Sequence, residues 1–405
     1  MASLTDRVRP VSAGAPVVGV HFFGRIPVFV LGEEALLFAS EDGERRVPIH
    51  GGGILASASD GTRIVTGGDD GRLIETNAGG EHQVIATDDK RRWIDQLALG
   101  PDGAVAWSAG KTAHVRSQKS EPRRFAVHEG AILAGASDGT RIVTGGDDGK
   151  LIATDARGEH QILATDDKRR WIDQMALGPD GAVAWSAGKV AHVLTKKGEA
   201  RSFEAPSTVA GLAFFPKGYR LAVAHYNGAT LWFPNAAGAK PETLEWKGSH
   251  LGVTVSPDGK FLVTTMQESM LHGWRIADAK HMRMSGYSAR VRSLSWSAGG
   301  EFLATSGSEQ LILWPFDGKE GPMGRQPQML AASPSRVAVV ACHPRQPVVA
   351  VGYADGVVRL VRIDDGAVIL ARAADEQQVS ALRWNANGRL LAFGTEAGDA
   401  GVLAL

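Results

Sequence analysis

Two charged pentapeptides are the residues of this chain whose types and spacing could do the most specific chemistry. They are Asp88, Asp89, Lys90, Arg91 and Arg92, and then, in the same order, Asp166, Asp167, Lys168, Arg169 and Arg170. Carboxylates and cations at this density form either a docking rim for a protein partner or ordinary solvated turns, in which each local ion pair contributes little stability. The sequence is compatible with both interpretations.

A second recurring pattern combines paired glycines with paired aspartates, which could suggest a calcium site. The two copies are Gly67-Gly68-Asp69-Asp70 and Gly145-Gly146-Asp147-Asp148. Calcium takes about six to eight oxygen ligands at a wider spacing. Adjacent aspartates in a tight turn also point to different sides. We therefore expect no metal site, and no cofactor.

Catalytic groups are not expected either. Cys342-His343 is the single Cys-His pair, and its position at the end of a strand is typical of a packed small residue. The twelve histidines are dispersed, and the paired aspartates lie in turns, where the backbone favours Asp. The chain contains no nucleophile elbow, phosphate-binding loop or dinucleotide fingerprint. The sequence thus predicts that the protein is not an enzyme.

The elements that must position these residues come from an internal repeat. The segment that begins at Ser59 returns at Ser137, and Trp93 returns as Trp171, always 78 positions later and with no insertion or deletion. Such a period has to be explained before any single motif, because it determines the fold. Each copy divides into two halves of about 39 residues, near the length of a four-stranded propeller blade.

Within each half, four short apolar runs are separated by Gly, Asp-Gly or Pro-Asp-Gly turns, as in TRIVTGG followed by Asp70-Gly71. Asp-Gly supplies the positive φ that tight hairpins need. Four short strands joined by tight turns predict an antiparallel meander. The fold class is therefore all-β.

Three later segments resemble WD40 repeats of the bacterial type. They read VTVSPDGKFLVTT (253–265), SLSWSAGGEFLATSGSEQLILWPF (293–316) and LRWNANGRLLAFG (382–394). The resemblance covers nearly the whole chain and implies a closed β-propeller that serves as a platform for protein partners. The Trp-Asp ending is degenerate, as in Trp314-Pro315, and the Gly-His dipeptide is missing. Apolar burial between sheets is therefore expected to replace the family's His–Asp hydrogen-bond network.

The strand pattern predicts one domain, residues 1–405, with ten four-stranded antiparallel blades. The blades are expected to begin near residues 17, 54, 93, 132, 171, 209, 251, 291, 337 and 379. The tenth has only three strands before the chain stops at Leu405, which would leave an open edge. Residues 4–11 are the one unassigned segment with strand character. We expect this N-terminal strand to complete the last blade and close the ring.

The near-identity of two adjacent blades points to recent copying. Folding alone does not demand the same charged pentapeptide twice, because solvated positions tolerate substitution. Removing 78 residues leaves an eight-bladed parent with about 41 residues per blade. The copies differ at scattered positions, such as Leu97 and Met175. Natural duplication and engineering of a blade-number variant both explain this pattern.

In a four-stranded blade, the connection to the next blade and the hairpin between the second and third strands share one face of the disc. The charged pentapeptides fall in the first kind of loop. The Gly-Gly-Asp-Asp turns fall in the second kind. All of them are therefore expected on one face.

Composition limits the partners. Lys+Arg and Asp+Glu are both 44, so the net charge is zero, which argues against nucleic acid. The single cysteine, Cys342, excludes an intrachain disulfide and fits a reducing compartment. Neither a membrane span nor the apolar stretch of a signal peptide is visible. We expect a cytoplasmic monomer without membrane or nucleic-acid partners.

Two function classes follow. The first is a non-catalytic scaffold that presents loops of a rigid disc to a protein partner, whose identity the sequence does not give. The alternative is a propeller enzyme with a site at the mouth of the central channel. The missing nucleophile, metal cluster and acid/base pair favour the scaffold.

Overall fold

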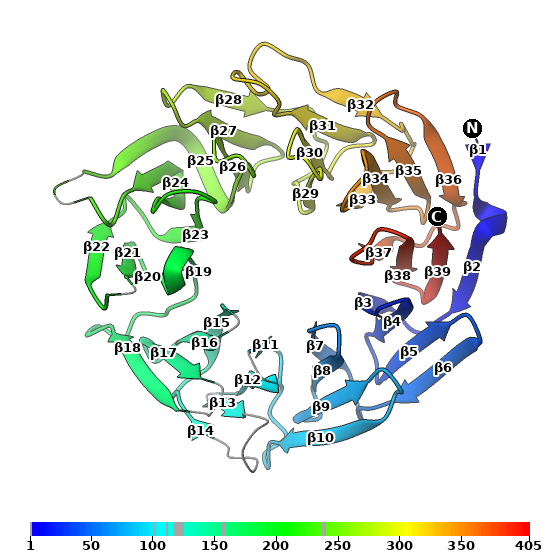
Figure 1. The fold of residues 1–405 in the computed structure, drawn as a ribbon, viewed down its shortest axis with the longest axis horizontal. Coiled ribbons are helices and arrows are strands. Elements are labelled where there is room, and N and C mark those ends of the chain that lie inside the picture. Colours follow the sequence, from blue (N-terminus) through cyan, green and yellow to red (C-terminus); the bar gives the residue numbers. More distant parts are fainter. Residues whose placement is uncertain are drawn as a thin grey trace.

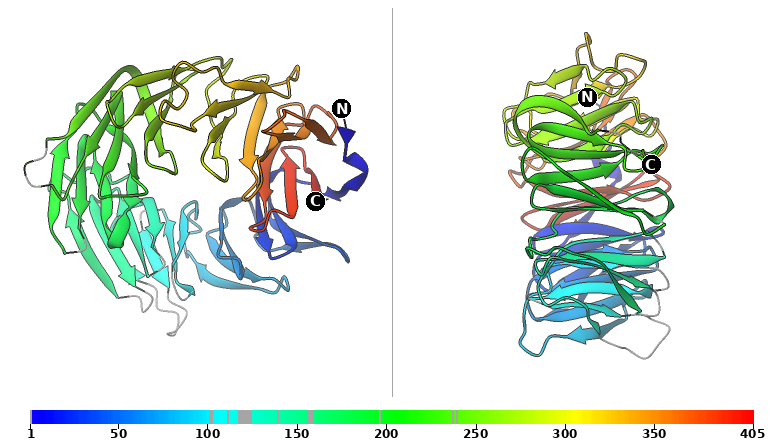
Figure 2. Two further views of the ribbon diagram at one scale, coloured as in Figure 1. Left: turned by 45° about the horizontal axis from the view of Figure 1, so that its top comes forward. Right: turned by 90° about the vertical axis from the view of Figure 1, so that its left-hand side faces the viewer.

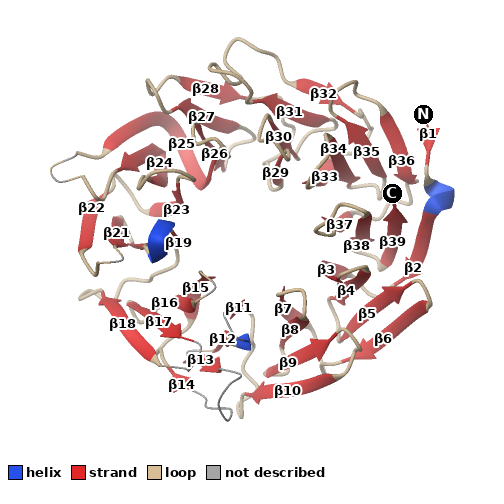
Figure 3. Ribbon diagram, viewed as in Figure 1, coloured by secondary structure: helices blue, strands red, loops and turns tan. Residues whose placement is uncertain are grey.

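The computed structural model describes residues 2–100, 103–110, 112–116, 125–138, 140–155, 159–195, 197–236, 238 and 240–405. Its strands form antiparallel sheets that follow one another around a ring, with the chain termini close together (Figure 1). The edge-on view in Figure 2 shows that the molecule is flatter along the ring axis than across it. Helix is limited, in the described residues, to short 3-10 turns such as η1 (Thr5–Arg7) and η3 (Pro179–Gly181), and strands dominate Figure 3.

The first five sheets have four strands each, in chain order from the ring axis outward. Sheet 1 contains β3 (Val17–Phe23), β4 (Ile26–Leu31), β5 (Ala35–Ser40) and β6 (Gly43–Pro48). Sheet 2 contains β7 (Ile54–Ser59), β8 (Arg63–Gly68), β9 (Arg72–Asn77) and β10 (His82–Thr87). Sheet 3 contains β11 (Leu97–Leu99), β12 (Val105–Ala109), β13 (Thr112–Arg116) and β14 (Phe125–Ala126). Sheet 4 contains β15 (Ile132–Ser137), β16 (Arg141–Gly146), β17 (Lys150–Asp155) and β18 (His160–Thr165). Sheet 5 contains β19 (Met175–Leu177), β20 (Val183–Ala187), β21 (Val190–Leu194) and β22 (Ala200–Glu204).

The remaining sheets complete the ring. Sheet 6 has six strands, β23 (Val209–Phe214), β24 (Leu221–Trp232), β25 (Glu242–Val255), β26 (Phe261–Met266), β27 (Leu271–Arg275) and β28 (His281–Met284). Sheet 7 contains β29 (Leu294–Trp296), β30 (Phe302–Thr305), β31 (Leu311–Pro315) and β32 (Gln328–Leu330). Sheet 8 contains β33 (Val337–Cys342), β34 (Val348–Tyr353), β35 (Val358–Arg362), β36 (Val368–Arg372) and β1 (Ala2–Ser3). Sheet 9 contains β37 (Val379–Trp384), β38 (Leu390–Thr395), β39 (Asp399–Ala404) and β2 (Val8–Ser12).

The second strand of most sheets is buried on both faces, as in β8 and β38. Each sheet is covered by a neighbour on either side, so its strands read as continuous apolar or small residues rather than as an alternation. The core is accordingly divided into clusters that lie between successive sheets. Packing of sheet on sheet therefore positions the loops at the ends of the strands.

The last sheet is completed from the other end of the chain. β2 pairs antiparallel with β39, with Val8 opposite Leu403 and Ser12 opposite Asp399. The strand begins at Val8 rather than at the expected Leu4, because η1 turns the chain between them. The preceding β1 instead pairs parallel with β36 of sheet 8.

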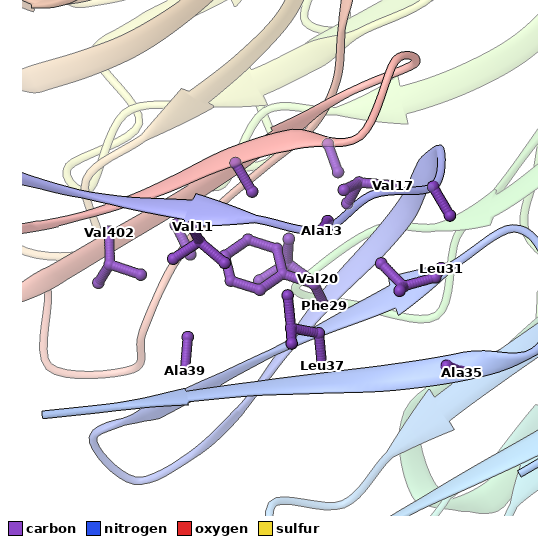
Figure 4. Close-up of a cluster of buried hydrophobic side chains, with 14 of the residues drawn as sticks. Val11, Ala13, Val17, Val20, Phe29, Leu31, Ala35, Leu37, Ala39 and Val402 are labelled. Atoms are coloured by element: carbon purple, nitrogen blue, oxygen red, sulfur yellow. The ribbon is translucent and has the colours of Figure 1, made fainter. Parts of the chain in front are cut away.

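The first and last sheets meet in an apolar cluster, which Figure 4 shows around Phe29. Val11 of β2, Val20 and Phe29 of sheet 1 and Val402 of β39 all belong to it. The Arg383 guanidinium adds a hydrogen bond of 3.2 Å to the Val20 carbonyl oxygen. The ring is thus closed by contacts between its two ends, and the β-propeller fold expected from the sequence is confirmed.

The expectation of ten separate blades is not confirmed, because the described strands are grouped into nine sheets. The difference lies in the long, curved β25, which no turn interrupts where one blade was expected to end (Figure 1). Its first half pairs with β24, and its second half, from His250, pairs with β26. Both sets of pairings therefore belong to the single six-stranded sheet 6.

Two expected blade starts are also displaced. The inner strands that were expected to begin at Trp93 and Trp171 begin at Leu97 and Met175. Trp93 and Trp171 therefore belong to the loops that join sheet 2 to sheet 3 and sheet 4 to sheet 5.

Candidate docking surface

One end of every sheet carries two kinds of loop, and we call this end the loop face. It holds the connection from each outer strand to the next inner strand and the hairpin between the second and third strands. In sheet 2, the Asp88 N–H donates to the Gly71 carbonyl at 2.8 Å, and the Ile94 N–H donates to the Gly68 carbonyl at 3.0 Å. The charged loop therefore lies directly on the Gly-Gly-Asp-Asp hairpin of its own sheet.

Residues 88–93, which we call the first charged turn, are organised by Asp88. Its carboxylate accepts hydrogen bonds from the backbone N–H groups of Lys90 at 3.1 Å and Arg92 at 3.0 Å. The Arg92 guanidinium adds two more, from Nε at 3.1 Å and from the terminal nitrogen at 2.6 Å. These bonds from Arg92, its side chain first, lower the pKa of Asp88 to about 2 against the opposing effect of burial.

Residues 166–171, the second charged turn, repeat this geometry. The Asp166 carboxylate accepts from the backbone N–H groups of Lys168 at 3.1 Å and Arg170 at 2.9 Å. Partial burial acts to raise the pKa of Asp166, but its hydrogen bonds with Arg170 outweigh that effect and lower it. The two turns are therefore the same structural module, used twice.

Each charged turn needs a glycine beneath it. Gly71 and Gly149 have φ of 73° and 75°, and a Cβ there would lie 2.8 Å from the Arg91 Cα and 2.9 Å from the Arg169 Cα. Both the left-handed backbone and the close approach exclude a larger side chain. The Asp-Gly of the hairpin thus fixes the position of the charged turn.

The hairpins also hold a buried hydrogen-bond network, which the sequence analysis did not expect. His50 Nδ1 lies 3.0 Å from Asp70 Oδ1, and His50 Nε2 lies 2.9 Å from Thr66 Oγ1. The same network joins His128, Asp148 and Thr144, with both distances at 2.9 Å. The expectation that apolar burial replaces His–Asp hydrogen bonds is therefore wrong for sheets 2 and 4, whose His residues come from the preceding loops.

The network keeps His50 neutral and Asp70 ionised. Burial lowers the pKa of His50 despite the opposing hydrogen bond to Asp70. Burial would raise the pKa of Asp70, but hydrogen bonds from the Gly51 N–H and from His50 bring it below its usual range. A neutral imidazole can donate from Nδ1 to the carboxylate and accept at Nε2 from the Thr66 hydroxyl. Every polar atom of this group is then satisfied, which anchors the loop face.

Three large aromatic side chains are exposed on the loop face. Trp93 and Trp171 end the charged turns and are each 63% exposed, and Tyr226, in the Tyr-Asn-Gly hairpin of β24, is 53% exposed. Tyr226 belongs to the same face, because its N–H donates to the Ser207 hydroxyl in the loop between sheets 5 and 6. Exposed aromatic side chains of this kind are enriched at protein interfaces.

A hollow of about 520 Å³ lies beside Trp93, between sheets 3 and 4. Its charged lining residues are Lys90, Arg91, Arg92 and Asp95, so cations predominate, and Ile132 and Leu133 of β15 add apolar surface. It opens near the inner strands β11 and β15, which lie toward the ring axis in Figure 1. A partner side chain could therefore contact apolar and cationic groups together here.

The two charged turns differ in how their exposed arginines are paired. Arg169 forms an ion pair of 3.1 Å with Glu129, which also binds Lys150. The position equivalent to Glu129 in the first copy is Gly51. Within the described residues, the Arg91 side chain consequently has no carboxylate partner. The first charged turn presents more unpaired positive charge than the second.

The other candidate residues occupy structural positions. Cys342 is largely buried, its thiol donates to the Ser295 carbonyl at 3.3 Å, and burial raises its pKa to about 11. His343 accepts from the Arg345 and Gln346 N–H groups and bonds to the Gly388 carbonyl. Across the part of the chain that the structure describes, no three His, Cys, Asp or Glu residues are placed to share a metal ion. In that same part, no helix is long and apolar enough to cross a bilayer.

Sequence reasoning placed the ten charged residues in loops but missed the exposed tryptophans beside them. It assigned Trp93 and Trp171 to inner strands, since each precedes an apolar run. The overlooked signal was the Asp-Asp-Lys-Arg-Arg run itself, whose first residue caps a turn that extends beyond the Trp. The His50, Thr66 and Asp70 network was signalled by the identical spacing of His128, Thr144 and Asp148.

Comparisons with known proteins agree with this architecture. Residues 344–404 match the anaphase-promoting complex subunit 4 WD40 domain, and residues 280–314 match the WD domain, G-beta repeat. No curated protein matches the sequence. The crystal structure of the computationally designed Ika8 protein is similar over 97% of this chain and 98% of that chain, with a TM-score of 0.54 and 15% identity, which shows the fold alone.

The crystal structure of RRP9 WD40 repeats has a TM-score of 0.42 and 16% identity, over 68% of this chain and 94% of that one. That likeness is too weak to carry an argument. The two family matches lie within sheets 6 to 9, where the Ser-Pro-Asp-Gly-type turns and Leu-x-Leu-Trp strands occur. The chain therefore contains WD40 repeats and has a β-propeller fold.

Proposed function

We propose that this protein is a non-catalytic scaffold that binds a protein partner through its loop face. The observation that carries the proposal is the gathering of Trp93, Trp171 and Tyr226, the exposed large aromatic side chains of the described residues, on that one face. WD40 propellers typically act as platforms for other proteins. A rigid ring presents such side chains at low entropic cost, since their loops are already ordered.

The first charged turn is the main contact in this proposal. Trp93 supplies a large apolar surface. Lys90 and Arg91, which form no ion pair with any described residue, supply positive charge beside the hollow. In the second charged turn, Glu129 neutralises Arg169. Asp89 and Asp167 are exposed as well, so the rim carries both signs of charge. Binding at the first turn is accordingly expected to favour acidic groups next to an apolar side chain.

We also propose that the ring acts as one domain of ten blades, with sheet 6 serving as two of them. Ala222, Leu231 and Leu244 pack with Leu262 and Trp274 in one buried cluster, although all five belong to strands of sheet 6. A single flat sheet cannot bury its residues against itself. Sheet 6 is better explained as two layers, joined where β25 passes from one to the other.

A sharp reversal within β24 supports the same proposal. His225 Nε2 lies 2.9 Å from Thr230 Oγ1. In a straight strand these residues would be about 16 Å apart, beyond the reach of both side chains. Asn227 and Gly228 both have positive φ, as in a tight hairpin turn. β24 then supplies the second and third strands of one blade. We further propose that an eight-bladed parent gained two blades by copying of 78 residues.

Affinity capture tests the scaffold function, with the paired copies as internal controls. The double variant Trp93→Ala/Trp171→Ala should lose most of the partner captured from a lysate of the source cell. Val84→Ala/Ile162→Ala removes two comparably exposed apolar side chains, 50% and 53% exposed, from the outer strands β10 and β18. This control should retain the partner. Equal capture by both double variants would overturn the proposed surface.

A further inference from the structure

A groove on the outer rim of the ring, away from the loop-face tryptophans, has a distinct chemistry. It encloses about 580 Å³ between β28 of sheet 6 and the loop that joins β31 to β32 of sheet 7. Four of the eight methionines of the chain line it, Met282, Met284, Met323 and Met329. Unbranched thioether side chains adapt to varied apolar ligands and are over-represented at adaptable binding surfaces.

The floor of the groove is preformed. Met282 and Met284 are buried in the cluster that joins sheets 6 and 7, together with Ile312 and Trp314. The Trp314 indole N–H donates to the buried Tyr287 hydroxyl at 2.7 Å, which fixes the ring. Met323 is only partly buried and Met329 is 48% exposed. The rigid floor thus carries two movable methionines on its walls.

The rim of the groove is cationic. Lys280, Arg283 and Arg325 line it, and no Asp or Glu is among its described lining residues. Arg325 is already paired with Asp317 at 2.6 Å. Lys280 and Arg283 form no ion pair with any described residue, and both are exposed. Asp278 interacts electrostatically with Lys280, but it is itself paired with Arg275, so the rim keeps a net positive charge next to the apolar floor.

The strand beside the groove has a free edge. β28 is the last strand of sheet 6, and among the described strands it pairs with β27 alone. Its side chains alternate, since His281 and Arg283 are exposed whereas Met282 and Met284 are buried. An added strand would place alternate side chains on the same two faces, one toward the methionines and one toward Arg283.

From this combination we propose that the groove binds an extended segment of a partner protein in which apolar and acidic residues alternate. The backbone of the segment adds to the edge of β28. Its apolar side chains cover Met282 and Met284, and its carboxylates lie beside Lys280 and Arg283. The charge complementarity of the rim selects an acidic segment, and the methionines accept several apolar side chains without a defined shape.

Methionine-methyl NMR tests this assignment. The protein is labelled with ¹³C-methyl methionine and titrated with the peptide Glu-Leu-Asp-Phe-Glu-Leu-Asp. We expect the signals of Met282, Met284, Met323 and Met329 to shift, while those of Met175, Met266 and Met270, which do not line the groove, stay in place. Shifts confined to the second group, or no shift at all, would refute the site.

Two matched double variants distinguish binding in the groove from nonspecific attraction between opposite charges. Lys280→Glu/Arg283→Glu should weaken peptide binding by about tenfold or more, because two attractions become repulsions. Lys217→Glu/Lys240→Glu makes the same change of charge at exposed positions outside the groove and should leave binding unchanged. Equal weakening by both variants contradicts the proposal.

Altered peptides and dilution complete the test. Replacing each acidic residue of the peptide by Lys, or each apolar residue by Ser, should abolish the methionine shifts. Binding of either altered peptide at the original strength would exclude an alternating acidic segment. Dilution of the free protein should leave the four signals unmoved. If they move, a second copy of this chain occupies the groove instead.

Discussion

The Arg92 guanidinium holds the Asp88 carboxylate through two hydrogen bonds, and Trp93 follows directly on the exposed side of this pair. The ion pair therefore serves to shape the turn rather than to meet a partner. Under the proposed function, Lys90, Arg91 and Trp93 remain exposed to contact the partner. The charged turn thus contains two kinds of residue: Asp88 and Arg92 are bound to each other, whereas Lys90 and Arg91 flank this pair with free, exposed side chains among the described residues.

Loss of the anchor should loosen the loop without unfolding the ring. In Asp88→Asn the charge-assisted bonds to Arg92 are lost, and we expect the free energy of unfolding to fall by about 1–2 kcal/mol. Amide hydrogen exchange at Lys90 and Arg92 should accelerate, because their N–H groups donate to this carboxylate. Urea unfolding and hydrogen exchange measure the two effects.

The second copy gives the matched comparison. Asp166→Asn should cost the same within experimental error, because its bonds have the same pattern. Asp89→Asn changes an exposed neighbour and should have little effect. A loss of stability in Asp89→Asn as large as in Asp88→Asn would contradict the assigned role.

The N-terminal strand should stabilise the whole ring. Deleting residues 1–12 removes β2 from the edge of β39 and takes Val11 out of the cluster at the closure. We expect the melting temperature to drop by several degrees or the truncated chain to associate through its exposed edge. Calorimetry and analytical ultracentrifugation detect these outcomes.

Deleting residues 1–3 alone is the control for this truncation. It removes only β1, whose two residues are exposed and pair with the outer strand of sheet 8. A monomeric 1–12 truncation with the stability of the 1–3 truncation would show that β2 does not hold the ring closed.

Removing one repeat should yield a folded eight-bladed ring, provided that the cut respects the His–Asp network. Deleting residues 127–204 removes sheets 4 and 5 and joins Ala126 to Ala205. The loop before β23, which follows sheet 5 in the full chain, then follows sheet 3. Gly178 lies against Phe214 at the present junction. Gly100, its copy, would take that place. Circular dichroism and a cooperative thermal transition test whether the shortened chain folds.

A second deletion of the same length, with its end points shifted by five residues, is the control. Deleting residues 132–209 keeps His128 but removes its partners Thr144 and Asp148. A buried imidazole without partners costs about 1–3 kcal/mol. This second deletion should therefore be less stable than the first. Failure of both deletions to fold would refute the eight-bladed parent.

Much of the fold was predictable because the strands repeat and are apolar on both faces. Asp70-Gly71 marked a hairpin from residue type alone, and the missing fourth strand after Leu405 pointed to the N-terminus. The bounds were less accurate. Leu4 was assigned to the closing strand, but the 3-10 turn that follows it leaves only Val8–Ser12 in the sheet. Local turns of this kind depend on hydrogen bonds that hydrophobic patterning does not record.

Sheet 6 and the loop face were harder to predict, for two different physical reasons. The segment from Glu242 to Val255 has no glycine-rich break where two blades were expected to part. Gly248, with a φ of 129°, lies within β25 and does not end the strand. Trp93 looked like the start of a strand because it precedes an apolar run. Its exposure follows from the hydrogen bonds of Asp88, which hold the following residues in a turn. At Trp93, five residues after Asp88, the chain has not yet reached β11. Neither feature is visible without the three-dimensional pairing.

Mild acid should destabilise the folded ring. Several histidines are buried in the neutral form, and burial lowers the pKa of His21 to about 4 and that of His272 to about 3. These groups become protonated in the unfolded chain near pH 6.5, but only well below that in the folded ring. The unfolded state therefore binds more protons, and the free energy of unfolding must fall as the pH drops below 6.5.

A substitution at His272 measures how much one buried histidine contributes to this pH dependence. His272 is fully buried and stacked on Trp246 at 4.0 Å between ring centroids, and neither ring nitrogen has a hydrogen-bond partner among the described residues. His272→Phe keeps a stacked ring and removes the titrating group. Between pH 7.5 and 5.5 the wild-type protein should lose about 1.4 kcal/mol more stability than the variant. At pH 7.5 the variant should be at least as stable, because no buried nitrogen is left unsatisfied. Urea titrations at both pH values measure the difference, and parallel losses in the two proteins would show that His272 is not held neutral by burial.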